Sequence, residues 1–183
     1  MSADIYGYLE EMPRWIRRKD WTGLESRFQE LANELAGVTQ ANRIAKIVFS
    51  QYQKSLSENL RRAIKRASDR GAKALYFEYD LDNDWQSTFF ICDKYAPESE
   101  GNDDWACEWV EDLAGPKFPA LGEVYLENGF DRTEAAKGCT LYLIARTVAA
   151  FGRCLDEHLA PATLAVCVAF HDQDPNFRLQ ERT

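Results

Sequence analysis

The sequence has no run of about 20 consecutive apolar residues, the length that a helix needs to cross a bilayer. Its start, Met-Ser-Ala-Asp-Ile-Tyr-Gly-Tyr, lacks the basic and then apolar segments of a signal peptide. We therefore expect a cytoplasmic protein with no membrane partner.

Histidine is scarce, and the common catalytic motifs are missing. The chain contains no G-x-x-x-x-G-K-[ST], G-x-G-x-x-G, G-x-S-x-G or H-E-x-x-H pattern. Phosphate-cradling loops, dinucleotide folds, nucleophile elbows and zinc-protease helices each need one of these patterns. We accordingly expect no enzyme activity, no catalytic residue, no cofactor and no metal.

Cysteine is present, but not in a pattern that forms disulfides or binds metals. The five cysteines include no C-x-x-C pair, and most of them lie in apolar runs. Cys139 and Cys154 fall in one predicted helix, which places them roughly 22 Å apart. The pattern is typical of buried free thiols in a reducing compartment.

Acidic residues outnumber basic ones, and their distribution is uneven. The 183 residues contain 22 Lys and Arg against 30 Asp and Glu, a formal charge of -8. This balance argues against direct binding of nucleic acid, because affinity for phosphates comes mainly from Lys and Arg. Residues 1–71 carry a charge of +4 and residues 72–183 a charge of -12. The split predicts either two surfaces with different roles or two layers that attract each other.

The first third of the chain has the apolar spacing of helices. One stripe covers residues 24–35 and is followed by Gly37, where a C-cap glycine belongs. A longer stripe follows Thr39, covers residues 44–64 and stops at Gly71, which predicts one long helix.

Beyond these helices the apolar period changes to two, which indicates strands. Residues 73–95 predict an antiparallel hairpin, with turn chemistry at 81–84 and a second strand from Trp85 to Tyr95. A polar loop follows at 96–104, and alternation over 105–110 predicts a third strand.

The last third predicts two helices and a central strand. Pro119 opens a short helix, and the capping-box spacing of Asp131 and Glu134 opens a long helix near 132–158. The apolar run 163–170 predicts a strand covered on both faces, and the polar tail from His171 is expected to fray.

These elements predict one domain, residues 1–183, of the α+β class. A mainly antiparallel sheet packs against the N-terminal helices and the long helix near 132–158. Residues 1–71 form the helical layer, and residues 72–183 form the sheet with the remaining helices.

The two histidines mark the positions at which chemistry is conceivable. His158 follows Asp156 and Glu157 at a helix end, where a cation is favoured by terminal carbonyls. His171 follows the apolar strand and precedes Asp172 and Asp174, a set that could bind a metal if other ligands converged there.

The acidic residues concentrate in the hairpin, the loop and the third strand, and tryptophans lie among them. Aromatic anchors surrounded by carboxylates match the composition of an interface for a basic protein. The predicted partner-binding residues are Asp82, Asp84, Trp85, Glu98, Glu100, Asp103, Asp104 and Trp105. Trp105 and Trp109 alternate with polar residues, so both could instead face the core.

The order of these segments resembles a known group of proteins. A long helix ends at Gly71, the strand sequence 73–80 and the strand 85–95 follow, and then comes the acidic aromatic segment 104–109 with its Glu-Trp pair. This layout over roughly residues 40–160 is similar to that of small cytosolic immunity proteins that accompany bacterial polymorphic toxins.

The resemblance implies a non-enzymatic inhibitor that binds one cognate toxin and blocks its active site. A basic toxin domain is the expected partner, because a cleft that binds nucleic acid or nucleotides is basic. One alternative is a small hydrolase or metal-dependent enzyme that uses His171 and nearby carboxylates. Another is an antirestriction or DNA-mimic inhibitor, which needs carboxylates spaced like phosphates.

Overall fold

The computed structural model describes residues 4–171 and 176–183. The helices are α1 (Ile5–Leu9), α2 (Met12–Ile16), α3 (Trp21–Ala36), α4 (Val38–Ala45), α5 (Ser50–Arg70), α6 (Pro119–Asn128) and α7 (Glu134–Glu157). The strands are β1 (Ala74–Tyr79), β2 (Ser87–Cys92), β3 (Trp109–Ala114), β4 (Ala165–Phe170) and β5 (Phe177–Gln180). Two short 3-10 helices, η1 (Glu98–Glu100) and η2 (Asp104–Cys107), lie between β2 and β3.

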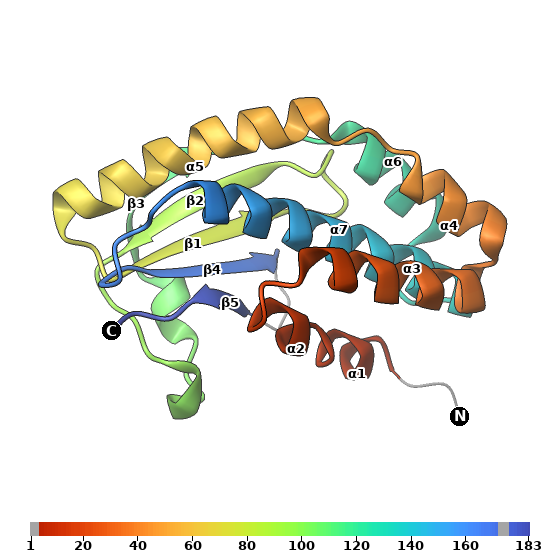
Figure 1. The fold of residues 1–183 in the computed structure, drawn as a ribbon, viewed down its shortest axis with the longest axis horizontal. Coiled ribbons are helices and arrows are strands. Elements are labelled where there is room, and N and C mark those ends of the chain that lie inside the picture. Colours follow the sequence, from red (N-terminus) through yellow and green to blue (C-terminus); the bar gives the residue numbers. More distant parts are fainter. Residues whose placement is uncertain (1–3, 172–175) are drawn as a thin grey trace.

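The five strands form one mixed sheet in the order β3-β2-β1-β4-β5 (Figure 1). β1 runs parallel to β4, and the other three pairings are antiparallel. Phe77 in the middle of β1 lies opposite Phe89 of β2 and Val168 of β4, so large apolar side chains line one face. The α+β fold with a mainly antiparallel sheet is therefore confirmed.

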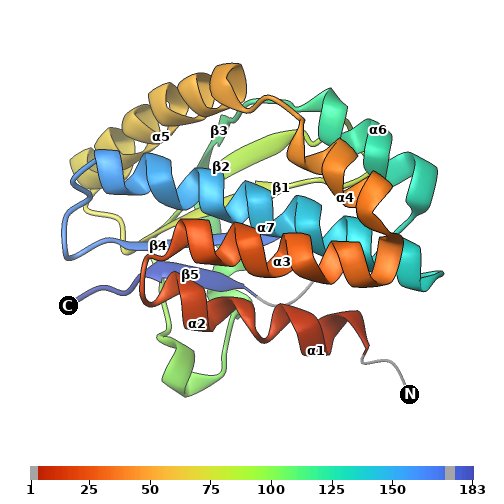
Figure 2. The same cartoon turned by 45° about the vertical axis from the view of Figure 1, so that its right-hand side comes forward.

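The helices form a layer on that face of the sheet, with α7 at its centre. α3 and α5 lie on either side of α7, and α1 and α2 continue the layer below α3 (Figures 1 and 2). Gly152 of α7 allows this close approach, because the Trp21 ring of α3 lies directly over it. Among the described residues, no helix is both long and apolar enough to cross a membrane.

Arg146 of α7 fastens the neighbouring helices from within the layer. Its guanidinium donates hydrogen bonds to the main-chain carbonyls of Ile44 and Ile47, the latter at 3.1 Å. It lies 4.1 Å from the centre of the Phe49 ring and 3.5 Å from a carboxylate oxygen of Glu25. One largely buried cation therefore joins α7, α3 and the segment between α4 and α5.

That segment corrects the prediction of one long helix ending at Gly71. The chain forms two helices, α4 and α5, separated by residues 46–49. Arg146 takes carbonyls that would otherwise continue the helix, and Phe49 turns into the core. Gly71 ends α5 in the left-handed conformation, as predicted, with a φ of 67°.

Two predicted strands begin later than expected. β2 starts at Ser87, because Asp84 and Trp85 both have a φ of 54° and belong to the turn. β3 starts at Trp109, because η2 interrupts the extended chain. In both places buried tryptophans fix a turn where the alternation had indicated a strand.

The C-terminal part differs from the prediction in two ways. α7 begins after Thr133, whose hydroxyl oxygen accepts a hydrogen bond from the Ala136 N–H, rather than at Asp131. The tail does not fray throughout, since β5 pairs with β4 and buries Phe177 and Leu179. β4 itself is buried along its whole length, as expected for a central strand.

We expect Gly152→Ala to destabilise the protein, although alanine favours helices. A Cβ at Gly152 would lie 2.5–2.6 Å from three ring atoms of Trp21, so the packed ring must shift. Overpacking of this kind costs about 1–3 kcal/mol, measured as the free energy of unfolding in urea. Trp21→Phe in the same chain should recover part of the loss. If both single changes and the pair were simply additive, the proposed packing would be wrong.

Candidate functional site

The sheet face opposite the helices is covered by the loop of residues 93–108. The loop leaves the end of β2 and crosses the outer face toward β5. Its anchor is Trp105, which is 4% exposed and contacts the rings of Tyr76 and Tyr95 at centroid distances of 6.4 and 4.9 Å. Trp105 therefore belongs to the core below the loop, and it is corrected as a partner-binding residue.

Arg178 of β5 holds the loop in place. Its side chain is 8% exposed and donates hydrogen bonds to the carboxylate of Asp103, to the Tyr95 hydroxyl at 3.2 Å and to the Ala96 carbonyl at 3.2 Å. The Tyr95 hydroxyl in turn donates to Glu181, and burial together with this bond raises the pKa of Tyr95. The carboxylate of Asp103 is thus neutralised by Arg178 within the protein and is not free to bind a partner.

The other acids of the loop lie at the surface, where Glu108 is bound to Lys94 and Asp93 follows the end of β2. Glu98, Glu100 and Asp104 are exposed, and the described residues provide none of them with an ion-pair partner. Glu98 and Asp104 line a surface hollow of about 550 Å³ together with Asp103 and Arg178. Glu100 does not line this hollow. Residues 98–104 therefore present three uncompensated carboxylates on a fixed backbone.

Trp109 is an exposed aromatic residue, whereas the sequence pattern left open whether it faces solvent or the core. It is 48% exposed, and its ring lies 4.7 Å from that of Phe90 on the outer face. Val110 beside it is 44% exposed. The η2 turn breaks the alternation, so that Trp105 turns inward while Trp109 stays at the surface. We call Glu98, Glu100, Asp104, Trp109 and Val110 the acidic loop surface.

The other predicted residues lie at the opposite end of the hairpin. Asp82 and Asp84 are exposed in the turn between β1 and β2, whereas the loop leaves the far end of β2. Six paired residues at about 3.3 Å each separate the two ends by roughly 20 Å. Burial and a hydrogen bond with Asp82 raise the pKa of Asp80, so acids also crowd this turn. The structure does not bring the two acidic groups together.

Trp85 is buried and cannot anchor a partner, which corrects its predicted role. Its ring is 0% exposed and stacks on Tyr79 at 5.5 Å. Its Nε1–H donates to the Thr147 hydroxyl at 3.0 Å, which satisfies the only polar group of the side chain. Trp85 thus fastens the turn to α7.

The structure describes only part of the predicted site around His171. The Nδ1 atom of His171 lies 2.9 Å from a carboxylate oxygen of Glu78. Asp172 and Asp174 lie outside the described residues. Among the residues that are described, no group of three or more potential metal ligands converges.

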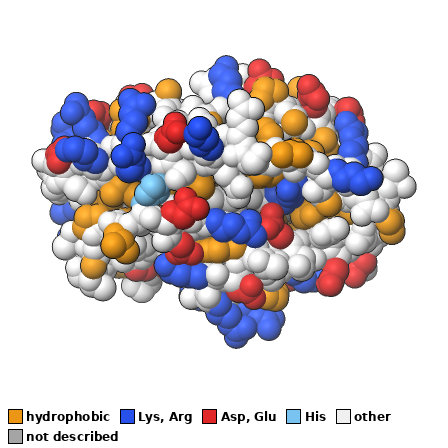
Figure 3. Space-filling model, turned by 45° about the horizontal axis from the view of Figure 1, so that its top comes forward, with side chains coloured by type: hydrophobic (Ala, Val, Ile, Leu, Met, Phe, Trp, Pro, Cys, Tyr) orange, Lys and Arg blue, Asp and Glu red, His pale blue; other side chains and the backbone are white. Residues whose placement is uncertain are grey.

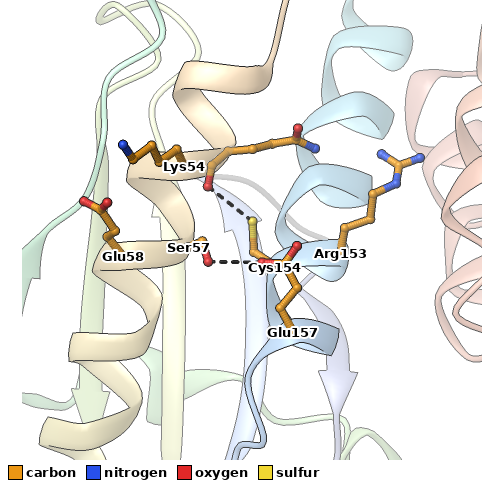
Figure 4. A pocket seen from close by; sticks show the side chains of 7 residues that line it. Lys54, Ser57, Glu58, Arg153, Cys154 and Glu157 are labelled. Atoms are coloured by element: carbon orange, nitrogen blue, oxygen red, sulfur yellow. Dashed lines mark hydrogen bonds between the residues drawn. The ribbon is translucent and has the colours of Figure 1, made fainter.

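A second hollow, of about 510 Å³, lies between α5 and α7 (Figure 4). At its edge Ser57 Oγ lies 2.8 Å from His158 Nε2 and 3.2 Å from a carboxylate oxygen of Glu157, a set reminiscent of a hydrolase. However, Nε2 also lies 3.0 Å from the Ser57 carbonyl oxygen, which can only accept. Nε2 therefore carries the proton and cannot remove one from the serine.

His158 is the C-cap residue of α7, as its place at a helix end predicted, but the same contacts give its ring a different role. Its ring does not lie against the terminal carbonyls of its own helix but binds α5, and so ties the end of α7 to it. Cys154 nearby is no nucleophile either, because burial raises the pKa of its thiol to about 12. The cluster is a structural contact between helices.

Basic side chains gather over the C-terminal part of α5 (Figure 3). Part of this charge is neutralised within the molecule, since Arg66 and Arg70 bind Glu111 of β3 at 2.6 and 3.3 Å. Attraction between the basic first part and the acidic second part is therefore real at this position, as one of the two interpretations of the charge split expected.

We expect Asp103→Asn to cost about 1–2 kcal/mol in the free energy of unfolding, because it weakens the pairing of the buried Arg178. Asp104→Asn is the matched control: its carboxylate is exposed, so the change should stay within about 0.5 kcal/mol. Urea denaturation followed by tryptophan fluorescence measures both. Equal effects of the two changes would contradict the role assigned to Asp103.

Thiol labelling should distinguish Cys107 from the other cysteines. Cys107 is exposed, whereas Cys92, Cys139, Cys154 and Cys167 are buried, and burial raises the pKa of all four. A chromogenic disulfide reagent at pH 8 should therefore react rapidly with one thiol of the folded protein. Cys107→Ser should abolish the rapid phase, and its persistence in that variant would be inconsistent with this arrangement.

Comparison with known proteins adds no assignment to this geometry. The chain matches no protein-family model, no curated protein and no solved structure. The similarity in layout to immunity proteins stays an expectation from the sequence.

Proposed function

We propose that the protein is an immunity protein that binds and neutralises a cognate bacterial toxin through the acidic loop surface. The observation that carries the proposal is the state of Glu98, Glu100 and Asp104. They are exposed and unpaired among the described residues, while their neighbour Asp103 is bound to Arg178. Uncompensated charge on a fixed support is suited to a partner of opposite charge.

The support of the loop reduces the cost of binding. Arg178 and the buried Trp105 hold the backbone from below, so less conformational freedom is lost when a partner docks. Trp109 and Val110, where the chain leaves the loop and enters β3, supply exposed apolar area that a partner can bury. The carboxylates raise the rate at which a basic partner associates, and the aromatic ring that it buries slows its dissociation.

A basic toxin domain is the partner that fits this surface. A toxin that acts on nucleic acid or nucleotides has a cleft that attracts phosphates, and clustered carboxylates complement such a cleft. Inhibition requires only that the surface covers the cleft, so no chemistry by the immunity protein is involved.

We expect the neighbouring reading frame to encode the toxin domain, and the test co-expresses that domain with each variant while cell growth is measured. The combined change Glu98→Lys, Glu100→Lys and Asp104→Lys should abolish protection and weaken binding by about tenfold or more at low salt. The electrostatic part of the loss should shrink as salt is raised.

A second variant with the same change of net charge serves as control. The control carries Asp82→Lys, Glu123→Lys and Asp131→Lys, at the β1–β2 turn and around α6. Asp82 and Asp131 lie close to each other there, since both raise the pKa of Tyr125. This variant should protect like the original protein. If only the control variant lost protection, the binding site would lie at the β1–β2 turn and not at the acidic loop surface. If the unaltered protein gave no protection, the proposed function would be wrong.

A further inference from the structure

The two edges of the sheet are protected to different extents. β5 at one edge is flanked by α2 (Figures 1 and 2). β3 at the other edge pairs only with β2, and four of its six residues are exposed. Exposed edges normally carry a device that prevents pairing with another strand.

The outward-facing groups of β3 follow from its register. The Gly115 N–H donates to the carbonyl of the directly opposite Ser87, and bonding positions alternate along an antiparallel pair. Leu113 and Glu111 therefore bond to β2, while the main-chain N–H and C=O groups of Asp112 and Ala114 point away from the sheet. A bulge at Val110 limits the regular edge to residues 111–114.

We propose that this edge binds an extended, basic amphipathic strand of a partner protein. The proposal deepens the function proposed above and rests on it for the identity of the partner as the toxin. Main-chain hydrogen bonds to Asp112 and Ala114 provide affinity, and the side chains on the two faces select the sequence.

The charges of the two faces determine what kind of strand fits. On the outer face a new strand meets the exposed carboxylate of Asp112 and, beyond the bulge, the half-exposed ring of Trp109. Lys or Arg is favoured there. On the helix side Glu111 is already bound to Arg66 and Arg70, and Leu113 packs on the core, so apolar side chains fit better.

A second copy of the chain fits this edge poorly. Two-fold pairing centred on the regular edge places the Asp112 carboxylates of the two copies directly opposite each other, and a shift by two residues leaves them diagonal neighbours. Like charges at these positions oppose pairing. The edge is therefore complementary to a basic strand rather than to itself.

The experiment uses a fluorescent peptide of alternating Lys and Val as the probe. Two control peptides replace Lys with Glu, or keep every Lys and replace one central Val with Pro. The Lys-Val peptide should bind the unaltered protein in a fluorescence anisotropy titration, and both control peptides should bind at least about tenfold more weakly, since Pro removes a donor for the ladder. The amide proton of Asp112 should exchange more slowly with the Lys-Val peptide bound.

Ala114→Pro tests the edge without changing charge. The Ala114 N–H points outward, so proline leaves the ladder to β2 intact but blocks the new strand. Ala114→Val keeps the N–H and is the matched control. Binding of the Lys-Val peptide should fall about tenfold in the proline variant alone, with unchanged circular dichroism and Tm.

Several results would overturn the proposal that the β3 edge binds a basic strand, and one would separate it from the proposed immunity function. Equal binding of both Lys peptides, equal binding to both variants, or no binding overturns the edge proposal. Sedimentation showing a dimer that Ala114→Pro dissociates overturns it too, because the occupant is then a second copy. Protection from the toxin by Ala114→Pro, with peptide binding lost, would leave the immunity function standing and remove the edge from toxin recognition.

Discussion

The arrangement of the whole molecule depends on a sheet whose central strands bury side chains on both faces. β4 is buried at every position, and Cys167 on its outer face is as inaccessible as Val168 on its helix face. Two covers are therefore required. The helices around α7 supply one, and the acidic segment between β2 and β3, with its short 3-10 helices η1 and η2, supplies the other.

This requirement explains why a polar segment is so firmly held. A loop rich in carboxylates has little apolar area to bury, and Trp105 provides most of what it has. Arg178 compensates by binding Asp103 and the Ala96 carbonyl from below. Asp103 is used to attach the loop, and Glu98, Glu100 and Asp104 stay exposed with no ion-pair partner among the described residues.

The elements with strong periodicity could be predicted from the sequence, and the turns fixed by distant contacts could not. The helical stripe that ends at Gly71 and the apolar run of β4 need only local pattern. The break between α4 and α5 depends on Arg146, about 100 residues away, and the start of β2 depends on Thr147. For the site, the acidity of the loop could be predicted from the sequence. Alternation alone could not distinguish the buried Trp105 from the exposed Trp109, because η2 interrupts the strand between them.

The formal charge of -8 acquires a meaning only through these positions. Acids at the hairpin turn lie roughly 20 Å from those of the loop, so a uniform negative field is a poor description. Glu98 and Asp104 line a hollow with Arg178 of β5, whereas the open edge of β3 is the opposite edge of the sheet. Charges on a surface mainly raise the rate of encounter, whereas main-chain bonds along an edge slow dissociation. The proposed partner therefore has to be basic where it meets the loop and extended where it meets β3, which restricts it far more than net charge does.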